Sequence, residues 1–225
     1  MSQFKRKSIW ENIGILALLS VVFLAYSYPL IAHWSTQVIG LDTTDSDTPQ
    51  IFCNLWWFEQ GWKQGNIWHT QEVLYPVGGN TLMHGYLPLM GFMHWLFGGN
   101  VFSFINTYVF LSVLLAGLGA FRLAKIWIPG FWGPALVAFL FVFNSFKLAQ
   151  WQDHYWYVLN FSIPWYLMAL RQIFSFHPFR IASYKALLGA FLLGLLSASI
   201  EFYATFYLIY LSIAYVLWKW LRNPF

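Results

Sequence analysis

A long uncharged apolar segment near the N-terminus constrains the fold of this chain more than any other feature of the sequence. It runs from Asn12 to His33 and follows the basic residues Lys5, Arg6 and Lys7. At about 1.5 Å per residue, a helix over this segment is long enough to cross a hydrocarbon core of ~30 Å. A cleaved signal peptide has a shorter apolar region, of roughly 7–15 residues, and ends in small residues. We therefore expect a retained signal anchor whose N-terminus is cytoplasmic.

The composition extends this expectation to the whole chain. Of the 225 residues, 59% are hydrophobic and only 9% are charged, against roughly 45–50% and about 25% in soluble domains. Aromatic residues reach 22%, a content that suits lipid-facing surfaces and interfacial belts. The single cysteine, Cys53, excludes an internal disulfide. We expect an all-α, polytopic transmembrane helical bundle that forms one membrane domain over residues 1–225, with no nucleic-acid partner.

Apolar runs in the second half of the chain predict further membrane spans. Together with the N-terminal segment they give about six spans, placed at residues 102–121, 128–146, 155–170, 186–200 and 202–218. The last two runs would exceed the thickness of the bilayer as one helix. We therefore expect Ser197 to Ser199 and Glu201 to mark a tight hairpin tip.

Residues 34–100 are expected to form an external loop that contains two interfacial helices. After Asp47, the sequence Thr48-Pro49 is a helix-start signal. It predicts a short amphipathic helix over 48–64 whose Trp residues face lipid. The apolar stretch 86–97 is too short to cross the bilayer and predicts the second interfacial helix. Between them, the Pro- and Gly-containing sequence 75–80 predicts a turn.

This topology separates the charges of the chain. Ten lysines and arginines fall on the cytoplasmic side and only Lys63 and Lys147 fall outside, as the positive-inside rule predicts. Among the acidic residues, only Glu11 is cytoplasmic. Because acidic residues contribute little to orientation, their collection on the external face indicates another role.

The external face therefore holds the candidate functional residues. They are Asp42, Asp45, Asp47, Lys147, Asp153, His154 and Glu201. Ionisable groups at membrane depth are costly and usually functional. Each also has a purely structural interpretation. The aspartates fit a solvated turn and helix cap, Lys147 fits a side chain that snorkels to the interface, and the other three fit ordinary loop or hairpin positions.

The order of these motifs resembles the first half of the GT-C integral membrane glycosyltransferases, which include protein O-mannosyltransferases and lipid A aminoarabinose transferases. The similarity is carried by Asp47-Thr48-Pro49-Gln50 with Trp56-Trp57, by Tyr75-Pro76-Val77-Gly78-Gly79-Asn80, and by Leu87-Pro88-Leu89 with Trp95-Leu96-Phe97-Gly98. In that family the first external loop carries a catalytic Asp and two juxtamembrane helices. Because the relatives are longer and have seven spans, we expect the chain to correspond to their N-terminal part.

The resemblance implies an inverting transfer of a sugar from a polyprenyl-phosphate donor to a lipid or glycan acceptor. The reaction would take place at the external face of a membrane, for which we expect a bacterial plasma membrane. Asp47, or else Asp45 or Asp42, would take the acceptor proton as general base. Lys147 would meet the lipid phosphate, and we expect Asp153, His154 and Glu201 to bind substrate beside it.

Two questions remain open at the level of the sequence. The D-x-D spacing of Asp45 and Asp47 is compatible with a divalent cation, Mg²⁺ or Mn²⁺, but two carboxylates do not make a metal motif. The function also has two alternatives: a carrier or flippase of lipid-linked intermediates, and a non-catalytic subunit of a membrane complex.

The topology is tested by labelling single cysteines on intact cells in a Cys53→Ser background. Three variants on the external face should react with an impermeant thiol reagent: Asp45→Cys, Gly79→Cys and Gln152→Cys. Lys125→Cys and Arg180→Cys should react only after the membrane is permeabilised. Labelling of Lys125→Cys from outside would overturn the orientation, and the shared acidic face with it.

Overall fold

The computed structural model describes residues 2–39, 48–71, 77–80, 88–96, 98–150, 161–175, 181–200 and 202–222, most of which are helical. The elements in chain order are α1 (Ser2–Tyr26), the 3₁₀ helix η1 (Leu30–His33), α2 (Thr48–Gln64), β1 (His69–Thr70), β2 (Gly79–Asn80), α3 (Pro88–Leu96), α4 (Val101–Ala124), α5 (Trp132–Val142), α6 (Ser145–Gln150), α7 (Ser162–Ser175), α8 (Ile181–Ile200) and α9 (Phe202–Arg222).

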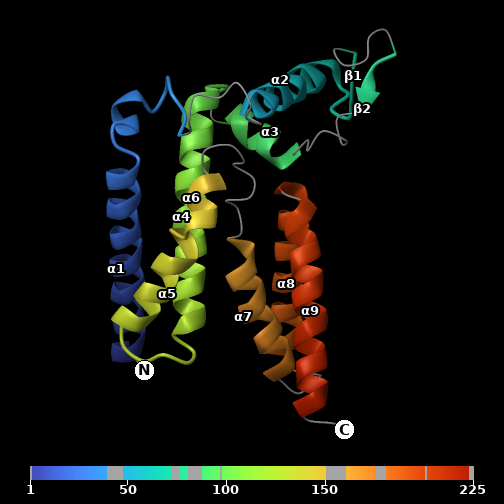
Figure 1. Ribbon diagram of the computed structural model, residues 1–225. Coiled ribbons are helices and arrows are strands. Elements are labelled where there is room, and N and C mark those ends of the chain that lie inside the picture. The colour runs from blue at the N-terminus through green and yellow to red at the C-terminus, as the bar shows by residue number, and fades with distance from the viewer. Residues whose placement is uncertain are drawn as a thin grey trace.

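The long helices are arranged along one axis (Figure 1). Helix α4 contacts α1, α5 and α7, and α8 contacts α7 and α9. Helices α2 and α3 and the two short antiparallel strands lie together at one end of the molecule, which we call the α2–α3 end. The start of α1 and the end of α9 lie at the opposite end.

Within the described ranges, two helical segments are long and apolar enough to cross a membrane, Ser8–Tyr26 and Val101–Ala124. Three shorter apolar helical stretches follow, Trp132–Val142, Tyr184–Leu195 and Thr205–Trp218. The predicted helical class is therefore confirmed. Of the predicted spans, those in α1 and α4 are matched by helices of sufficient length and hydropathy.

Two helix ends differ from the prediction near prolines and glycines. The first helix ends at Tyr26 instead of His33, because Pro29 lacks an N–H donor and the residue before a proline disfavours the helical conformation. The run 128–146 is not one helix. Gly130 has a φ of 81°, which ends the preceding turn, so α5 begins only at Trp132.

The predicted hairpin in the second half of the chain lies slightly further along the sequence. Ser197 to Ser199 belong to α8, which continues to Ile200, and α9 begins at Phe202. The three residues 197–199 are therefore helical, whereas Glu201 lies outside the described residues.

Both helices predicted in the external loop are present. Helix α2 covers the predicted range 48–64. Helix α3 has 9 residues, which at about 1.5 Å per residue is far too short to cross a bilayer. The two helices pack closely, since a Cβ on Gly91 of α3 would overlap the ring of Phe58 in α2.

Small residues on α4 allow the neighbouring helices to approach it. Ala116, Ala120 and Ala124 are all buried and repeat every fourth position. A Cβ on Gly117 would overlap Cδ1 of Leu19 in α1, and a Cβ on Gly119 would lie 2.7 Å from Nε1 of Trp165 in α7. Small residues at this spacing are the usual basis of close helix packing in membranes.

Substitution of Gly117 tests this packing. Gly117→Ala should lower the free energy of unfolding by about 1–3 kcal/mol, because the added methyl group must displace the buried Leu19 side chain. Gly194→Ala in α8 is the matched control, since a Cβ there meets nothing within 4 Å, and it should be neutral or stabilising by up to about 1 kcal/mol. Equal thermal midpoints in detergent for the two variants would contradict the packing.

Candidate functional site

Six of the seven residues predicted to form the site lie outside the described residues. They are Asp42, Asp45, Asp47, Asp153, His154 and Glu201. The structure places the seventh, Lys147, and it places the residues that flank the acidic segment 40–47. These flanking residues and Lys147 define where a site can lie.

The chain that enters the acidic segment is held against α4 by Asn106. This side chain is fully buried, and its Nδ2 donates to the carbonyl oxygens of Trp34 at 2.9 Å and Gln37 at 2.7 Å. Its Oδ1 accepts a hydrogen bond from the amide of Ile39 at 3.2 Å. The Asn100 side chain, which also caps α4, donates to the carbonyl of Ser35 at 3.3 Å. Residues 34–39 are therefore fixed beside the first turns of α4.

The chain that leaves the acidic segment is held beside the same helix. Ile51 and Leu55 of α2 are buried in a cluster that includes Phe104 of α4. Phe52 of α2 also meets Phe102 of α4 edge-on, with 5.7 Å between the ring centroids. Both flanks of the segment that contains the three candidate aspartates are thus anchored at the α2–α3 end.

Lys147 in α6 is a buried cation. Lys147 is only 4% exposed, and its Nζ lies 4.2 Å from the centroid of the Phe141 ring. The ion pairs found in the described parts of the chain, Lys63 with Glu59 and Lys125 with Glu11, do not include it. Burial lowers the pKa of Lys147 to about 8. The side chain is therefore still mostly protonated at neutral pH, at a cost in free energy.

A break in the helix explains how Lys147 comes to be buried. Helix α5 ends at Val142, and the Oδ1 of Asn144 accepts a hydrogen bond from the amide of Lys147 at 2.9 Å. Asn144 Nδ2 donates to the carbonyl of Phe141 at 3.0 Å. Asn144 thus satisfies the end of one helix and the start of the next. Leu148 then packs on the same buried cluster as α2 and α4.

His94 of α3 is a second buried titratable group at this cluster. It is 4% exposed and meets Phe104 edge-on, with ring centroids 5.5 Å apart. Its Nε2 is buried and has no hydrogen-bond partner in the described part of the structure. Burial lowers the pKa of His94, which keeps the imidazole neutral at pH 7. No sequence spacing distinguished this histidine from the others.

A polar cavity of about 150 Å³ lies where α2 meets β1. It is lined by two indoles, three glutamine side chains and three further residues, namely Trp56, Trp57, Gln60, Gly61, Gln64, His69, Thr70 and Gln71. Trp56, which is 46% exposed, and Trp57 both line this cavity, and the prediction that the Trp residues of this helix face lipid stays a prediction. Flat aromatic faces beside amide donors and acceptors suit a ligand that has both apolar faces and hydroxyl groups.

Several of the described cations gather at one end of the molecule. At the end where α1 begins, Lys125 pairs with Glu11 at 2.9 Å, and Arg122 donates to Oδ1 of Asn12 at 3.3 Å. We call this the basic end, which contains Arg122, Lys125, Arg171 and Lys185. Lys63 lies at the α2–α3 end, and Lys147 precedes Leu148, which packs on the cluster shared by α2, α3 and α4.

A metal site receives no support from the described residues, among which no three His, Cys, Asp or Glu side chains are grouped as ligands. Asp45 and Asp47, the predicted pair for Mg²⁺ or Mn²⁺, lie outside those residues. Comparison with known proteins finds no match to the chain among family models, characterised proteins or solved structures.

Replacement of Lys147 by methionine tests the cost of its burial. Lys147→Met should raise the free energy of unfolding at pH 7 by about 1–4 kcal/mol, because it removes a buried charge and keeps most apolar contacts. The difference in free energy of unfolding between Lys147→Met and the wild type should shrink as the pH rises from about 8 to 10.5. Over this window the unfolded wild-type chain holds more protons than the folded protein, so wild-type stability rises with pH.

Lys63→Met is the matched control for this measurement. Lys63 is an exposed cation in α2, and its replacement should change the free energy of unfolding by no more than about 0.5 kcal/mol. A loss of stability in Lys147→Met at pH 7 would show that the charge of Lys147 stabilises the fold.

Proposed function

We propose that this chain is an integral membrane glycosyltransferase of the GT-C kind, or the N-terminal part of one. In this proposal the α2–α3 end binds the phosphate of a polyprenyl-linked sugar and transfers the sugar to a lipid or glycan acceptor. The observation that carries the proposal is the buried Lys147, a cation without a carboxylate partner in the described parts of the chain. A buried ionisable group in a membrane protein is usually functional.

Exposed apolar surface supports the placement in a membrane. Only 17% of the span Ser8–Tyr26 is buried inside the molecule, whereas the core helix of a soluble protein is mostly covered. In α8 and α9, large side chains such as Phe191 and Ile213 are more than half exposed. Lipid chains would cover these faces, in a bundle of about six spans in which α5, α7, α8 and α9 follow α1 and α4.

The distribution of charge supports an orientation. The basic end would be cytoplasmic under the positive-inside rule, and the α2–α3 end would then face outward, across a bacterial plasma membrane. Helix α3 contacts both α4 and α8, so α2 and α3 would lie at the external interface over the ends of these helices. This is the position that juxtamembrane helices hold in GT-C enzymes.

The transfer requires a cation for the leaving phosphate and a base for the acceptor. The acceptor oxygen forms a bond to the anomeric carbon while the bond from that carbon to the phosphate oxygen breaks, with inversion. Lys147 would stabilise the charge on the departing polyprenyl phosphate. The proton of the acceptor hydroxyl would pass to Asp47.

Asp47 is the preferred base because α2 begins at the next residue, Thr48. The N-terminus of a helix favours the ionised form of a neighbouring carboxylate. Asp42 and Asp45 remain the alternatives in the same segment. The cavity beside Trp56 and Trp57 would hold part of the sugar or of the acceptor, through its indole faces and amide groups.

Asp153, His154 and Glu201 retain their proposed role in substrate binding. The first two follow α6, which ends at Gln150, and Glu201 follows α8, whose C-terminal end points toward the α2–α3 end in Figure 1. A divalent cation, Mg²⁺ or Mn²⁺, stays an option for Asp45 with Asp47, but none of the steps above requires it.

Two substitutions test the proposal in a transfer assay with a polyprenyl-phosphate sugar as donor. Asp47→Asn should lower the rate about 10²–10⁴-fold with folding intact, because Asn caps a helix about as well as Asp. Lys147→Gln should weaken binding of polyprenyl phosphate by roughly 10–100-fold, because it removes a charged hydrogen-bond donor. Lys63→Gln, which removes an exposed cation at the same end, should change neither quantity.

The outcomes separate the proposal from its alternatives. Near-normal transfer by Asp47→Asn would remove Asp47 from the mechanism and leave Asp42 or Asp45. Binding of polyprenyl phosphate that depends on Lys147, with no transfer by the full-length protein, would favour a carrier. No binding and no transfer would overturn the proposal.

A further inference from the structure

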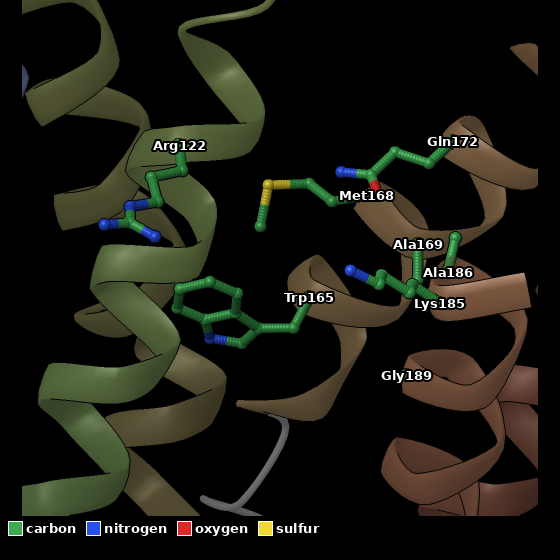
Figure 2. A pocket seen from close by; sticks show the side chains of 8 residues that line it. All are labelled: Arg122, Trp165, Met168, Ala169, Gln172, Lys185, Ala186 and Gly189. Atoms are coloured by element: carbon green, nitrogen blue, oxygen red, sulfur yellow. The ribbon is translucent and has the colours of Figure 1, made fainter. Parts of the chain in front are cut away.

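A cavity of about 300 Å³ opens between α4, α7 and α8 at the basic end (Figure 2). It lies at the opposite end of the molecule from Lys147 and has no role in the proposed transfer. Its lining combines two cations, an indole, an amide and small or apolar residues, namely Arg122, Trp165, Met168, Ala169, Gln172, Lys185, Ala186 and Gly189. Its volume is at the lower limit of typical ligand sites.

The polar groups of this cavity come from three helices. Figure 2 shows the Lys185 side chain and the Gln172 amide extending from α8 and α7 into the gap, with the Trp165 ring of α7 beside α4, whereas the Arg122 guanidinium points away from the gap. The Arg122 guanidinium lies 5.4 Å from the centroid of the Trp165 ring, and the indole N–H donates to the carbonyl of Leu115 at 2.9 Å. The Trp165 ring is therefore held in place before any ligand binds.

The positive charge of the cavity is not neutralised by the described carboxylates. The two ion pairs of the described residues join Lys63 with Glu59 and Lys125 with Glu11. Arg122 makes a hydrogen bond to the neutral Asn12, and Lys185 belongs to neither ion pair. An ammonium and an amide that extend into one cavity, with a guanidinium on its wall, suit an anion with several acceptor oxygens.

We propose that this cavity binds the phosphate group of an anionic membrane lipid. The proposal rests on the membrane placement and is independent of the glycosyltransferase chemistry. Basic pockets between helices at the cytoplasmic side of membrane proteins bind anionic headgroups in this manner. The headgroup phosphate would accept hydrogen bonds from the Lys185 ammonium and the Gln172 amide, and Arg122 would add positive charge at the wall of the cavity.

The surface next to the cavity favours a lipid over a soluble phosphate. Leu188 and Leu192 follow Lys185 by three and seven positions, so they lie on the same face of α8. They are 57% and 53% exposed. An acyl chain attached to a phosphate in the cavity would cover these two side chains as it runs along α8.

The site is tested by binding of phosphatidylglycerol to the purified full chain in detergent, measured by native mass spectrometry, with phosphatidylcholine as the zwitterionic comparison. Lys185→Gln should weaken binding of phosphatidylglycerol about fivefold, the effect of one cation at a membrane surface. Lys185→Arg should keep the affinity because it keeps the charge. Lys63→Gln removes a cation at the other end and should leave the affinity unchanged.

A second pair of variants tests the cavity without a change in charge. Gly189 lines the cavity and Gly194 does not, and a Cβ at either position meets nothing within 4 Å. Both substitutions to leucine favour the helix, so both variants should fold. Gly189→Leu fills the cavity and should weaken binding at least as much as Lys185→Gln, whereas Gly194→Leu should have no effect.

Three results would overturn the inference. The first is an unchanged affinity for phosphatidylglycerol in both Lys185→Gln and Gly189→Leu. The second is equal binding of phosphatidylcholine. The third is thermal stabilisation by inorganic phosphate equal to that by the lipid, which would assign the site to a soluble anion.

Discussion

The close approach of three helices to α4 is the constraint on which the rest of the structure depends. The missing Cβ of Gly117 leaves room for the Leu19 side chain of α1, and that of Gly119 leaves room for the Trp165 ring of α7. In a lipid environment the hydrophobic effect does not drive helices together, so close contact between backbones and side chains must supply the stability. Because α4 also carries Asn106, the same helix that organises the bundle fixes the chain that leads to the acidic segment.

The two ends of the bundle use charge in different ways. After the break that follows α5, Lys147 lies against the Phe141 ring in apolar surroundings, where burial lowers its pKa. At the basic end, Lys185 and Arg122 border an open cavity beside an exposed apolar face. In the two proposals, a phosphate group would bind at both places, as part of a substrate beside Lys147 and as part of a membrane lipid beside Lys185.

The sequence predicted the elements that depend on local patterns. The helix-start signal at Thr48 and the short apolar stretch before Gly98 predicted α2 and α3, and the long apolar runs predicted α1 and α4. Other features arise from tertiary contacts that leave no local pattern. The burial of Lys147 and His94 and the pocket beside Trp56 need segments distant in the sequence, and the break before α6 depends on an Asn144 cap that no periodicity marks.

The central claim is that lipid covers the exposed apolar faces of the helices, with the α2–α3 end in water. Spin labels at Phe191→Cys and Ile213→Cys, near the middle of α8 and α9, report whether these positions face lipid or water in bilayers. A label at Val77→Cys is the comparison, and all three variants are made in a Cys53→Ser background. Val77 is 80% exposed at the α2–α3 end. The account predicts high accessibility to oxygen and low accessibility to a water-soluble nickel complex at the two helix positions, and the reverse at position 77. Equal accessibility to nickel at all three positions would contradict it.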